Sequence, residues 1–394
     1  MGGLLGATIV LMHDVVIVGA GVAGSATAIH LARRGRSVLL IDRSSFPRRK
    51  PCGEGVFPRG LAELADLDVL ASLGNEAMNL RSVRFTLDQR HAEARIGWTG
   101  GGAIGVARDR LDALLLDSAA RAGADIETGV QVRKLVGADG RFNVETEGRS
   151  IDGSVIVAAD GLNSGLRHQA VLNSTTLGSR YGVSAHVNLT DAPPARIDVY
   201  FERGYQVYLT PLGGNLVNAA VLLDRARVSD LAGRLREGFI SLLSSVPVCE
   251  SGFELANEPM VTGPFPARAK SAWRENLVLV GDAAGFYDPI SGNGMTLALI
   301  SARHCAAAID ARLNTGLDDP LRMYGRQCRA LARNSTFFAR LILALAARPR
   351  MGGRVLSNLA RAPRTFGKLV AINDGELGLN ALRPRDLLGF ALGV

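Results

Sequence analysis

The sequence predicts an α/β fold, in which a Rossmann-like domain is interleaved with an antiparallel β-sheet domain and followed by C-terminal helices. Near the N-terminus a short apolar strand runs into a glycine-rich turn and then into a helix. Residues 181–224 alternate as β-strands do, and the chain beyond residue 316 has helical spacing. A length of 394 residues also exceeds what one hydrophobic core usually serves.

The composition is that of a folded globular protein, with 47% hydrophobic and 21% charged residues. The net charge of +8 is concentrated in residues 329–394, which hold eleven basic and three acidic residues. This distribution argues against a nucleic-acid partner, whose binding face would spread basic charge and interleave aromatic residues. The cysteines have no paired spacing and the six histidines no metal-binding spacing, so we expect no disulfide framework, no metal and a cytoplasmic location.

The first elements of the predicted parallel sheet surround the glycine-rich turn GAGVAG at residues 19–24. A buried strand is predicted over Val15–Val18, a helix over Ser25–Arg34, and a second strand over Val38–Ile41. Asp42 ends the second strand, 18 residues past the last glycine. The apolar segment Met1–Leu11 lacks a charged start and a cleavage site, so we do not expect it to be a targeting segment.

This strand–turn–helix–strand pattern predicts a dinucleotide-binding site. Gly19 permits the tight turn, Gly21 lets the backbone approach a pyrophosphate, and Gly24 lets the helix pack on the strand. The helix N-terminus offers N–H groups to the phosphates. Asp42 is placed to accept hydrogen bonds from a ribose, and the adjacent Arg43 is a further candidate contact.

Two later segments place an acid after a buried strand. Residues 155–159 form an apolar run that ends in Asp160-Gly161. Residues 277–280 form another that leads to Asp282, and a Pro/Gly-rich loop then enters a predicted helix over Thr296–Leu313. An acid at the carboxyl end of such a strand can reach a ribose-like chain.

Taken together, the segments GAGVAG (19–24), AADGLNS (158–164) and GDAAGFYDPISGNG (281–294) resemble the FAD-dependent family that joins aromatic-ring hydroxylases, flavin halogenases and geranylgeranyl reductases. The resemblance implies FAD as cofactor and NAD(P)H as reductant. It implies that Asp282 holds the ribityl chain and that Asp160-Gly161 contributes to FAD and NAD(P)H handling. It also implies that the following loop lies against the isoalloxazine, through Pro289, Gly292, Asn293, Gly294 and Met295.

An arginine that precedes a helix often contacts FAD in this family, which makes Arg108, before the predicted helix Leu111–Ala122, a candidate ligand. It could equally be a solvated residue at the helix start. A second segment, Pro51-Cys52-Gly53-Glu54, resembles the geranylgeranyl-reductase branch. Cys52 is a candidate proton donor, a packing residue or an inert buried thiol. Glu54 is a candidate acid–base group or a partner of the basic run at residues 48–50.

The expected domains are discontinuous. Residues 12–80, 100–175 and 265–315 are expected to form the FAD-binding domain, residues 81–99 and 176–264 the substrate-binding sheet, and residues 316–394 a C-terminal helical region. Helices are predicted over Arg322–Arg348 and Gly352–Arg361, where apolar and basic residues alternate. They could pack on the FAD-binding domain, close a hydrophobic tunnel, or make peripheral contact with an acidic membrane.

The leading functional hypothesis is an NAD(P)H-dependent monooxygenase that hydroxylates or epoxidises a hydrophobic or aromatic small molecule with molecular oxygen. A flavin-dependent reductase of carbon–carbon double bonds is the alternative. It is favoured by the Pro-Cys-Gly segment and by Gly285-Phe286, where hydroxylases commonly place His. A halogenase is disfavoured because Trp98 and Trp273 stand alone, without the family's Trp-x-Trp signature. A non-catalytic flavin-binding protein is a third hypothesis.

Overall fold

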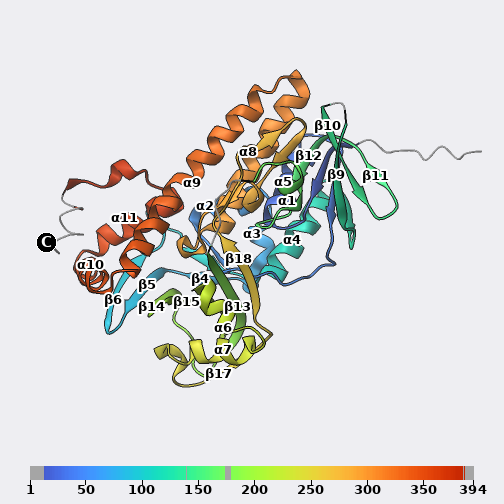
Figure 1. Cartoon of the computed structure of the whole chain (residues 1–394). Helices are drawn as coiled ribbons and strands as arrows, with labels where there is room; N and C mark the ends of the chain where they lie inside the picture. The colour runs from blue at the N-terminus through green and yellow to red at the C-terminus, as the bar shows by residue number, and fades with distance from the viewer. Residues whose placement is uncertain (1–12, 139, 174–178, 385, 387–394) are drawn as a thin grey trace, which may run out of the picture.

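The structure is a computed structural model that describes residues 13–138, 140–173, 179–384 and 386. The expectation for Met1–Leu11 therefore lies outside the described residues. A parallel sheet with its helices occupies one end of the molecule, and an antiparallel sheet lies beside it (Figure 1). The long helix α9 (Asp319–Ala346) leaves the first of these parts and leads to the last helices near the C-terminus.

The first sheet has six strands, and the pairing of all but its edge strand β20 is parallel. Each of its central strands is a short run of Val, Leu and Ile, as a strand covered on both faces requires. In spatial order the strands are β20 (Trp273–Arg274), β21 (Leu277–Leu279), β12 (Gly153–Ala158), β1 (His13–Val18), β2 (Val38–Asp42) and β8 (Asp125–Thr128).

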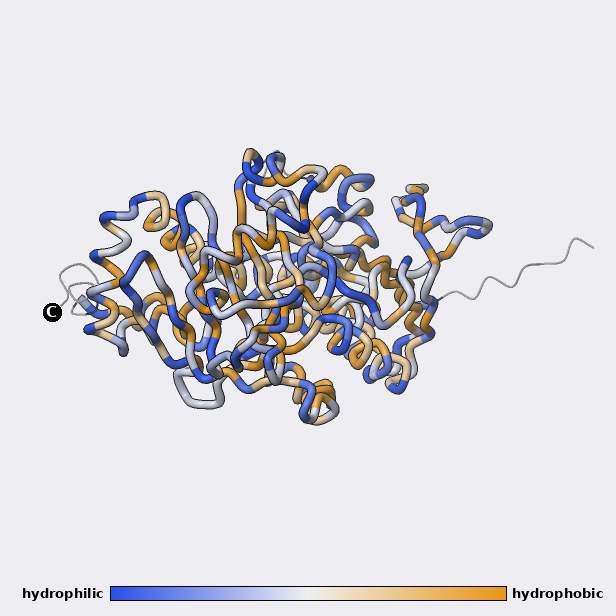
Figure 2. Tube along the Cα trace, turned by 90° about the horizontal axis from the view of Figure 1, so that it is seen from below, coloured by the Kyte–Doolittle hydropathy of each residue, from blue (hydrophilic) through white to orange (hydrophobic). Residues whose placement is uncertain are grey.

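Alternate residues of this sheet enter two different cores. Val15 and Ile17 of β1 pack against the helices α1 (Val22–Ala32), α4 (Arg108–Arg121) and α8 (Gly294–Thr315). Val16 and Val18 point the other way, toward a small sheet of β9 (Val132–Ala138), β10 (Arg141–Thr146) and β11 (Ser150–Ile151), and toward α5 (Gly165–Gln169). Hydrophobic stretches accordingly run through the interior of the chain trace, and hydrophilic ones gather at its outer turns (Figure 2).

The second sheet has eight strands, most of them antiparallel. The exception is the parallel pair of β5 with β14, which come from distant segments and so need no hairpin. The strands in order are β17 (Phe253–Leu255), β13 (Arg180–Leu189), β16 (Leu216–Asp224), β15 (Tyr205–Gly213), β14 (Arg196–Glu202), β5 (Ser82–Leu87) and β6 (Arg90–Arg95), with β18 (Met260–Phe265) beside β13. The helices α6 (Arg225–Asp230) and α7 (Leu235–Leu243) follow β16, and α7 packs on the outer face.

Over residues 316–383 the structure describes three helices where two were predicted: α9, α10 (Pro349–Arg361) and α11 (Pro363–Asp374). α9 packs on the first part of the molecule through α8, and α10 covers β5 and β6. α11 packs on β6 and also binds the first part, because Asp374 accepts from the N–H of Arg59 and the carbonyl of Asn373 accepts from Asn293. Of the two helices that were predicted, α9 packs on the expected FAD-binding domain, whereas α10 instead covers the second sheet. Prolines at 349 and 363 begin new helices because proline lacks the N–H that a continuing helix needs.

The remaining elements connect these layers. They are the sheet of β3 (Gly55–Val56), β7 (Ala103–Gly105) and β4 (Met78–Leu80), the pair β19 (Ala267–Arg268) and β22 (Gly285–Phe286), the helices α2 (Pro58–Asp66) and α3 (Leu70–Leu73), and the 3₁₀ turns at 74–76, 247–249, 281–283, 289–291 and 379–381. Over the described ranges, no single helix has both the length and the apolarity to cross a bilayer. The pair α9 and α10 meets those criteria only jointly and is bent by 119°.

Gly105 marks the closest approach of β7 to the second sheet, and it provides a stability test. A Cβ atom at Gly105 would lie 1.9 Å from the carbonyl oxygen of Pro211. We expect Gly105→Ala to lower the free energy of unfolding by about 1–3 kcal/mol, because neither backbone can move away cheaply. Thermal or urea denaturation measures the change.

The matched control is Gly367→Ala within α11, where an added Cβ meets no atom within 4 Å. This substitution should stabilise the protein by about 0.4–1 kcal/mol, since alanine loses less backbone entropy on folding. Equal effects of the two substitutions would contradict the close packing at Gly105.

Candidate functional site

A cleft with about 1580 Å³ of empty space, its open mouth included, lies between the carboxyl edge of the six-stranded sheet and the inner face of the eight-stranded sheet. Ligands commonly bind at this edge of open α/β sheets. Three loops contribute to its wall: the glycine-rich turn after β1, the segment at residues 50–55, and the loop at residues 282–295. Its far end is apolar and is formed by the eight-stranded sheet and the C-terminal helices.

The glycine-rich turn accepts only glycine at two positions. Gly19 has φ +107°, and a Cβ there would lie 2.4 Å from the carbonyl oxygen of Ala159. A Cβ on Gly24 would lie 1.8 Å from the carbonyl oxygen of Gly19, so α1 packs directly on the turn. These contacts are the ones that the pattern predicts for helix and strand packing.

Gly21 differs, because a Cβ there would meet side chains at the edge of the cleft rather than backbone. The atoms nearest to that position are nitrogens of Arg48, Arg108 and Lys50, at 3.7–3.9 Å. Three cationic groups therefore converge above the N-terminus of α1, whose unpaired N–H groups favour an anion. This arrangement suits the pyrophosphate of a dinucleotide.

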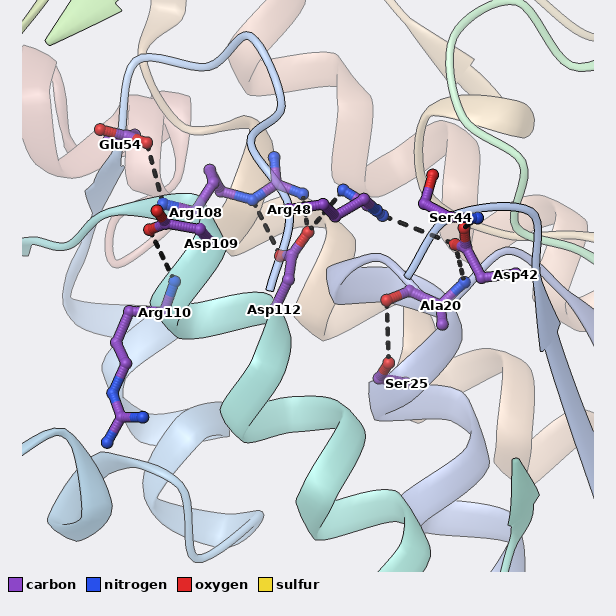
Figure 3. A network of polar contacts seen from close by, with 10 residues as sticks. All are labelled: Ala20, Ser25, Asp42, Ser44, Arg48, Glu54, Arg108, Asp109, Arg110 and Asp112. Carbon is purple, nitrogen blue, oxygen red and sulfur yellow. Dashed lines mark hydrogen bonds and ion pairs between the residues drawn. The ribbon is translucent and has the colours of Figure 1, made fainter. Parts of the chain in front are cut away.

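A chain of polar contacts connects the turn with the opposite side of the cleft (Figure 3). Asp42 accepts a hydrogen bond from the backbone N–H of Ala20 at 2.7 Å, and its carboxylate lies 3.5 Å from Arg48. Arg48 in turn contacts Asp112 at 3.1 Å. Arg108 binds the same carboxylate through two nitrogens, at 2.9 and 2.8 Å.

Arg108 is buried, so the predicted cofactor ligand is not a solvated residue. Its backbone N–H donates to Glu54 at 2.8 Å, while its guanidinium reaches the edge of the cleft above Gly21. The carboxylate of Asp112 raises the pKa of Arg108 against the effect of burial. Arg108 is therefore a fixed positive charge that joins the two sides of the site.

Lys50 lies inside the cleft, close to Gly161 and to the carboxylate of Asp282. Burial lowers the pKa of Lys50, and Arg108 and Arg48 act in the same direction, while Asp282 opposes them. Burial raises the pKa of Asp282, and the positive charges of Lys50, Arg108 and Arg167 oppose this rise. In the sequence Lys50 is only a member of the basic run at residues 48–50, and the folded chain places its side chain in the cleft wall.

Asp160 takes a different place from Asp282. Its Oδ2 accepts from the N–H of Leu166 at 3.2 Å, whereas its Oδ1 is buried without a hydrogen-bond partner among the described residues. Burial raises the pKa of this carboxyl, and hydrogen bonds from Ser164 and from nearby backbone oppose the rise. Asp160 itself is not part of the cleft wall, but Gly161 is.

The loop at residues 288–294 is held by the eight-stranded sheet. Arg180 of β13 pairs with Asp288 at 2.8 Å, and the hydroxyl of Tyr208 donates to the carbonyl of Ile290 at 2.7 Å. Burial raises the pKa of Tyr208 above its usual range, so the phenol stays protonated and donates.

The C-terminal helices hold the same loop from the opposite side. The amide of Asn293 accepts from the hydroxyl of Ser335 in α9 and donates to the carbonyl of Asn373 in α11. Asn293 is completely buried and does not line the cleft, so its side chain positions the loop. Pro289, Gly292, Gly294 and Met295 do line the cleft.

The segment at residues 51–55 brings a thiol and a carboxylate into the cleft. Burial raises the pKa of Cys52 and the carboxylate of Glu54 adds to the rise, while Arg108 opposes it. Glu54 has φ +56°, a conformation that favours glycine, and it lies between Gly53 and Gly55. A backbone held in this region costs energy and persists where surrounding contacts fix it.

Those contacts come from two elements. Besides accepting from the N–H of Arg108, the Glu54 carboxylate lies 2.6 Å from Nε2 of His186 in β13. His186 is buried and carries the only histidine contact to a cleft carboxylate among the described residues. Sequence reasoning missed it, because the six histidines were tested only for metal spacing and the pairing depends on tertiary structure.

A second cavity with about 550 Å³ of empty space adjoins the apolar end of the cleft. Phe85 and Phe338 line both cavities, so they lie where the two adjoin. The second cavity lies between β5, β14 and the three C-terminal helices, and every residue in its wall is apolar: Phe85, Leu87, Phe201, Phe338, Leu341, Ile342, Leu345, Ala346, Gly352, Val355, Leu356, Leu359, Phe366 and Leu369. Of the tyrosines of the eight-stranded sheet, Tyr208 lines the cleft, while Tyr200 and Tyr205 belong to the core behind the sheet.

The structure thus brings most of the predicted site residues to one cleft. Its wall contains both proposed catalytic residues and eight of the proposed cofactor contacts: Cys52, Glu54, Gly21, Arg108, Gly161, Asp282, Pro289, Gly292, Gly294 and Met295. Gly19, Gly24, Asp42, Asp160 and Asn293 lie behind this wall and shape it. Arg43 is exposed and does not line the cleft.

Comparison with known proteins agrees with this geometry. Residues 12–217 match the family model described as FAD binding domain. Menaquinone reductase from Mycobacterium tuberculosis is 30% identical over 327 residues, which cover 76% of this chain and 77% of the relative. Geranylgeranyl diphosphate reductase from Rhodobacter capsulatus is 28% identical over 331 residues, 79% of each chain. Among solved structures, the flavin-dependent brominase Bmp2 superposes with a TM-score of 0.81 at 17% identity, over 96% of this chain and 97% of the other. That likeness shows the fold alone.

The fold and the cleft define a flavoprotein of the FAD-dependent oxidoreductase class. The chain belongs to the FAD binding domain family, as the resemblance predicts. The residues present fit the cofactor, because a cationic cradle faces the N-terminus of α1 and a carboxylate, Asp282, follows β21 at the same edge. When bound, FAD supplies two-electron transfer chemistry.

Lys50 provides a test of the cofactor site. Lys50→Met removes one of the three cations above Gly21, and a charge-assisted hydrogen bond contributes about 1.5–3 kcal/mol. We therefore expect FAD affinity to fall by about one to two decades, measured by titrating the apoprotein with FAD. Lys134→Met, at an exposed position outside the cleft, is the matched control. An unchanged FAD affinity in a folded Lys50→Met protein would exclude this residue from the phosphate site.

Asp282 tests the other end of the cofactor. Asp282→Ala should also lower FAD affinity by about one to two decades, because the carboxylate is expected to bind the ribityl chain. The same titration applies, with circular dichroism to verify folding. If the affinity stays at the wild-type value, Asp282 has a structural role instead.

Proposed function

We propose that the protein is a reductase that saturates a carbon–carbon double bond in a long prenyl chain of a lipid, with NAD(P)H as the source of electrons. The observation that carries this proposal is the apolar cavity beneath α9–α11, which adjoins the cleft of Cys52 and shares Phe85 and Phe338 with it. A small aromatic substrate would not need that second cavity. The names of two relatives, menaquinone reductase and geranylgeranyl diphosphate reductase, support the same substrate class.

The reaction adds a hydride to one carbon of the double bond and a proton to its neighbour. A reduced flavin held in this cleft would supply the hydride, and a side chain of the cleft would supply the proton where water is excluded. Cys52 is the proposed donor, because it lines the cleft and its raised pKa keeps the thiol protonated at neutral pH. Glu54 is held by Arg108 and His186 and is the second proposed acid–base residue; it also positions the loop that carries Cys52.

The rest of the cleft would orient the chain and exclude water. Val83, Val199 and Leu222 of the eight-stranded sheet offer an apolar floor to the substrate. Burial of apolar chain along this floor contributes about 25 cal/mol per Å². An extended prenyl chain can therefore bind without polar contacts at its distal end, and its length is limited by the second cavity.

Monooxygenation of a hydrophobic or aromatic molecule, which our sequence analysis ranked first, is the second candidate. The observation in its favour is the cluster of aromatic side chains around the apolar part of the cleft, Phe85, Phe265, Phe286 and Phe338, which would also enclose an aromatic ring. In that reaction molecular oxygen is the co-substrate and Cys52 needs only to pack against the substrate.

Cys52→Ala separates the two candidates. In an anaerobic single turnover, with the flavin reduced beforehand and a prenylated quinone or prenyl diphosphate added, reoxidation should be 10²–10⁴-fold slower than in wild type. Absorbance at the flavin band follows the reaction, and Cys328→Ala in α9, which does not line the cleft, is the control. Reoxidation that needs oxygen and is insensitive to Cys52 would contradict the reductase and favour the monooxygenase.

Ala346→Phe tests the second cavity, because Ala346 lies in its wall. The larger side chain should lower kcat/KM for a prenyl chain of about four isoprene units or longer by tenfold or more, since bulk now fills the space for the distal end. Activity on a chain of one or two units should remain. Ala332→Phe on the exposed face of α9 is the control. Equal losses for short and long chains would exclude the cavity as the chain's binding site.

A further inference from the structure

An exposed basic surface covers the helices above the second cavity. Residues 320–373 contain eleven basic residues and no acidic residue. Seven of these, which we call the basic face, are exposed arginines of α9, α10 and the first turn of α11: Arg333, Arg340, Arg348, Arg350, Arg354, Arg361 and Arg364.

The charges of the basic face are not neutralised by the residues that the structure describes. In the described part of the protein, the only ion pairs made by residues 320–373 are Arg322 with Asp319 and Lys368 with Asp386, neither of which belongs to the face. Arg340 instead contacts the hydroxyl and the ring of Tyr287. The face therefore presents a strong positive potential to a partner.

Exposed apolar side chains lie among these arginines. Phe337 is 41% exposed and lies between Arg333 and Arg340 at helical spacing on α9. Met351 is 44% exposed and lies in the first turn of α10, next to Arg350. A surface that combines arginines with exposed large apolar residues is typical of helices that lie in the interface of a membrane.

The helices that carry the basic face also form the wall of the second cavity. Leu341, Leu345 and Ala346 of α9 and Val355 of α10 form the wall of the second cavity, while neighbouring turns of the same helices carry the basic face. A lipid chain that entered from this side would therefore pass between these helices and reach Phe85 and Phe338, and beyond them the cleft.

We propose that the basic face docks the protein on an anionic lipid bilayer and that the lipid substrate enters the second cavity from that bilayer. The inference rests on the proposed function, because a reductase of lipid chains must collect its substrate from a membrane. An acidic soluble protein would satisfy the arginines but would leave unexplained the exposed Phe337 and Met351 and the apolar cavity directly beneath them.

Binding to vesicles tests the docking surface without any turnover. The full-length FAD-loaded protein should co-sediment with vesicles of phosphatidylcholine containing 30% phosphatidylglycerol, and much less with phosphatidylcholine alone. Each arginine near an anionic surface contributes roughly a fivefold factor in binding, so the variant Arg350→Gln/Arg354→Gln/Arg361→Gln should bind on the order of a hundredfold more weakly. Raising the salt concentration should weaken wild-type binding, since it screens exposed charges.

The matched control, Arg121→Gln/Arg225→Gln/Arg234→Gln, removes the same charge from exposed positions on α4, α6 and the α6–α7 connection. It should keep nearly full binding if location matters and not net charge alone. Met351→Trp adds a fluorescent probe at the face, whose emission should shift to the blue on vesicle binding. Absence of wild-type binding at low salt, or equal losses for the two triple variants, would overturn the proposal and direct the search to an acidic protein partner.

A failure of membrane docking and a failure of the proposed reductase function would give different experimental results. Reduction of a short prenyl substrate in solution should be unchanged in the basic-face variant, because none of its substitutions lies in the cleft. Vesicle binding without any prenyl reduction would therefore refute the reductase and leave the docking surface intact, whereas reduction without vesicle binding would refute the docking surface alone.

Discussion

The buried pair of Arg108 and Asp112 joins the parts of the site that the chain order separates. Asp112 is completely buried and also receives Arg48, whose other contact is Asp42 beside the glycine-rich turn. Arg108 simultaneously donates its backbone N–H to Glu54. Removing one charge from such a pair leaves the other uncompensated in a dry interior, which typically costs 3–5 kcal/mol. The cofactor side and the thiol side of the cleft are consequently fixed by the same few charges.

Much of the first part of the fold was predictable because its signals are local. The strand–turn–helix pattern depends on glycines at 19, 21 and 24, and their steric contacts are those that the pattern implies. Helix ends were less accurate: α1 begins at Val22 rather than Ser25, since Gly21 already serves as its N-cap. The helix α11 was missed altogether, because Pro363 follows α10 after a single residue and the sequence shows no loop between them.

The parts of the site that escaped prediction depend on contacts between distant segments. His186 and Glu54 are 132 residues apart in the sequence, and no local pattern around either residue predicts their contact. Lys50 belongs to a basic run whose neighbours could all have faced solvent. The second cavity exists because α10 and α11 pack on β5 and β6, a pairing that periodicity cannot reveal. The sequence therefore indicates which residue types the site contains, whereas the contacts between them can be identified only from the folded structure.

The hydrogen bonds of Asn293 limit how far the C-terminal helices can be separated from the rest of the protein. Its buried amide is satisfied by Ser335 and by the carbonyl of Asn373, which lie 42 and 80 residues further along the chain. A chain truncated after α8 would retain every glycine motif and the hydrogen bond from Ser291 to Oδ1, yet leave Nδ2 of this amide without its acceptor at the start of that helix. A buried donor without an acceptor costs about 1–3 kcal/mol. The C-terminal helices thus cannot be exchanged independently of the rest of the chain. A chimera that takes these helices from another flavoprotein must also provide the hydrogen bonds that Ser335 and Asn373 make to Asn293.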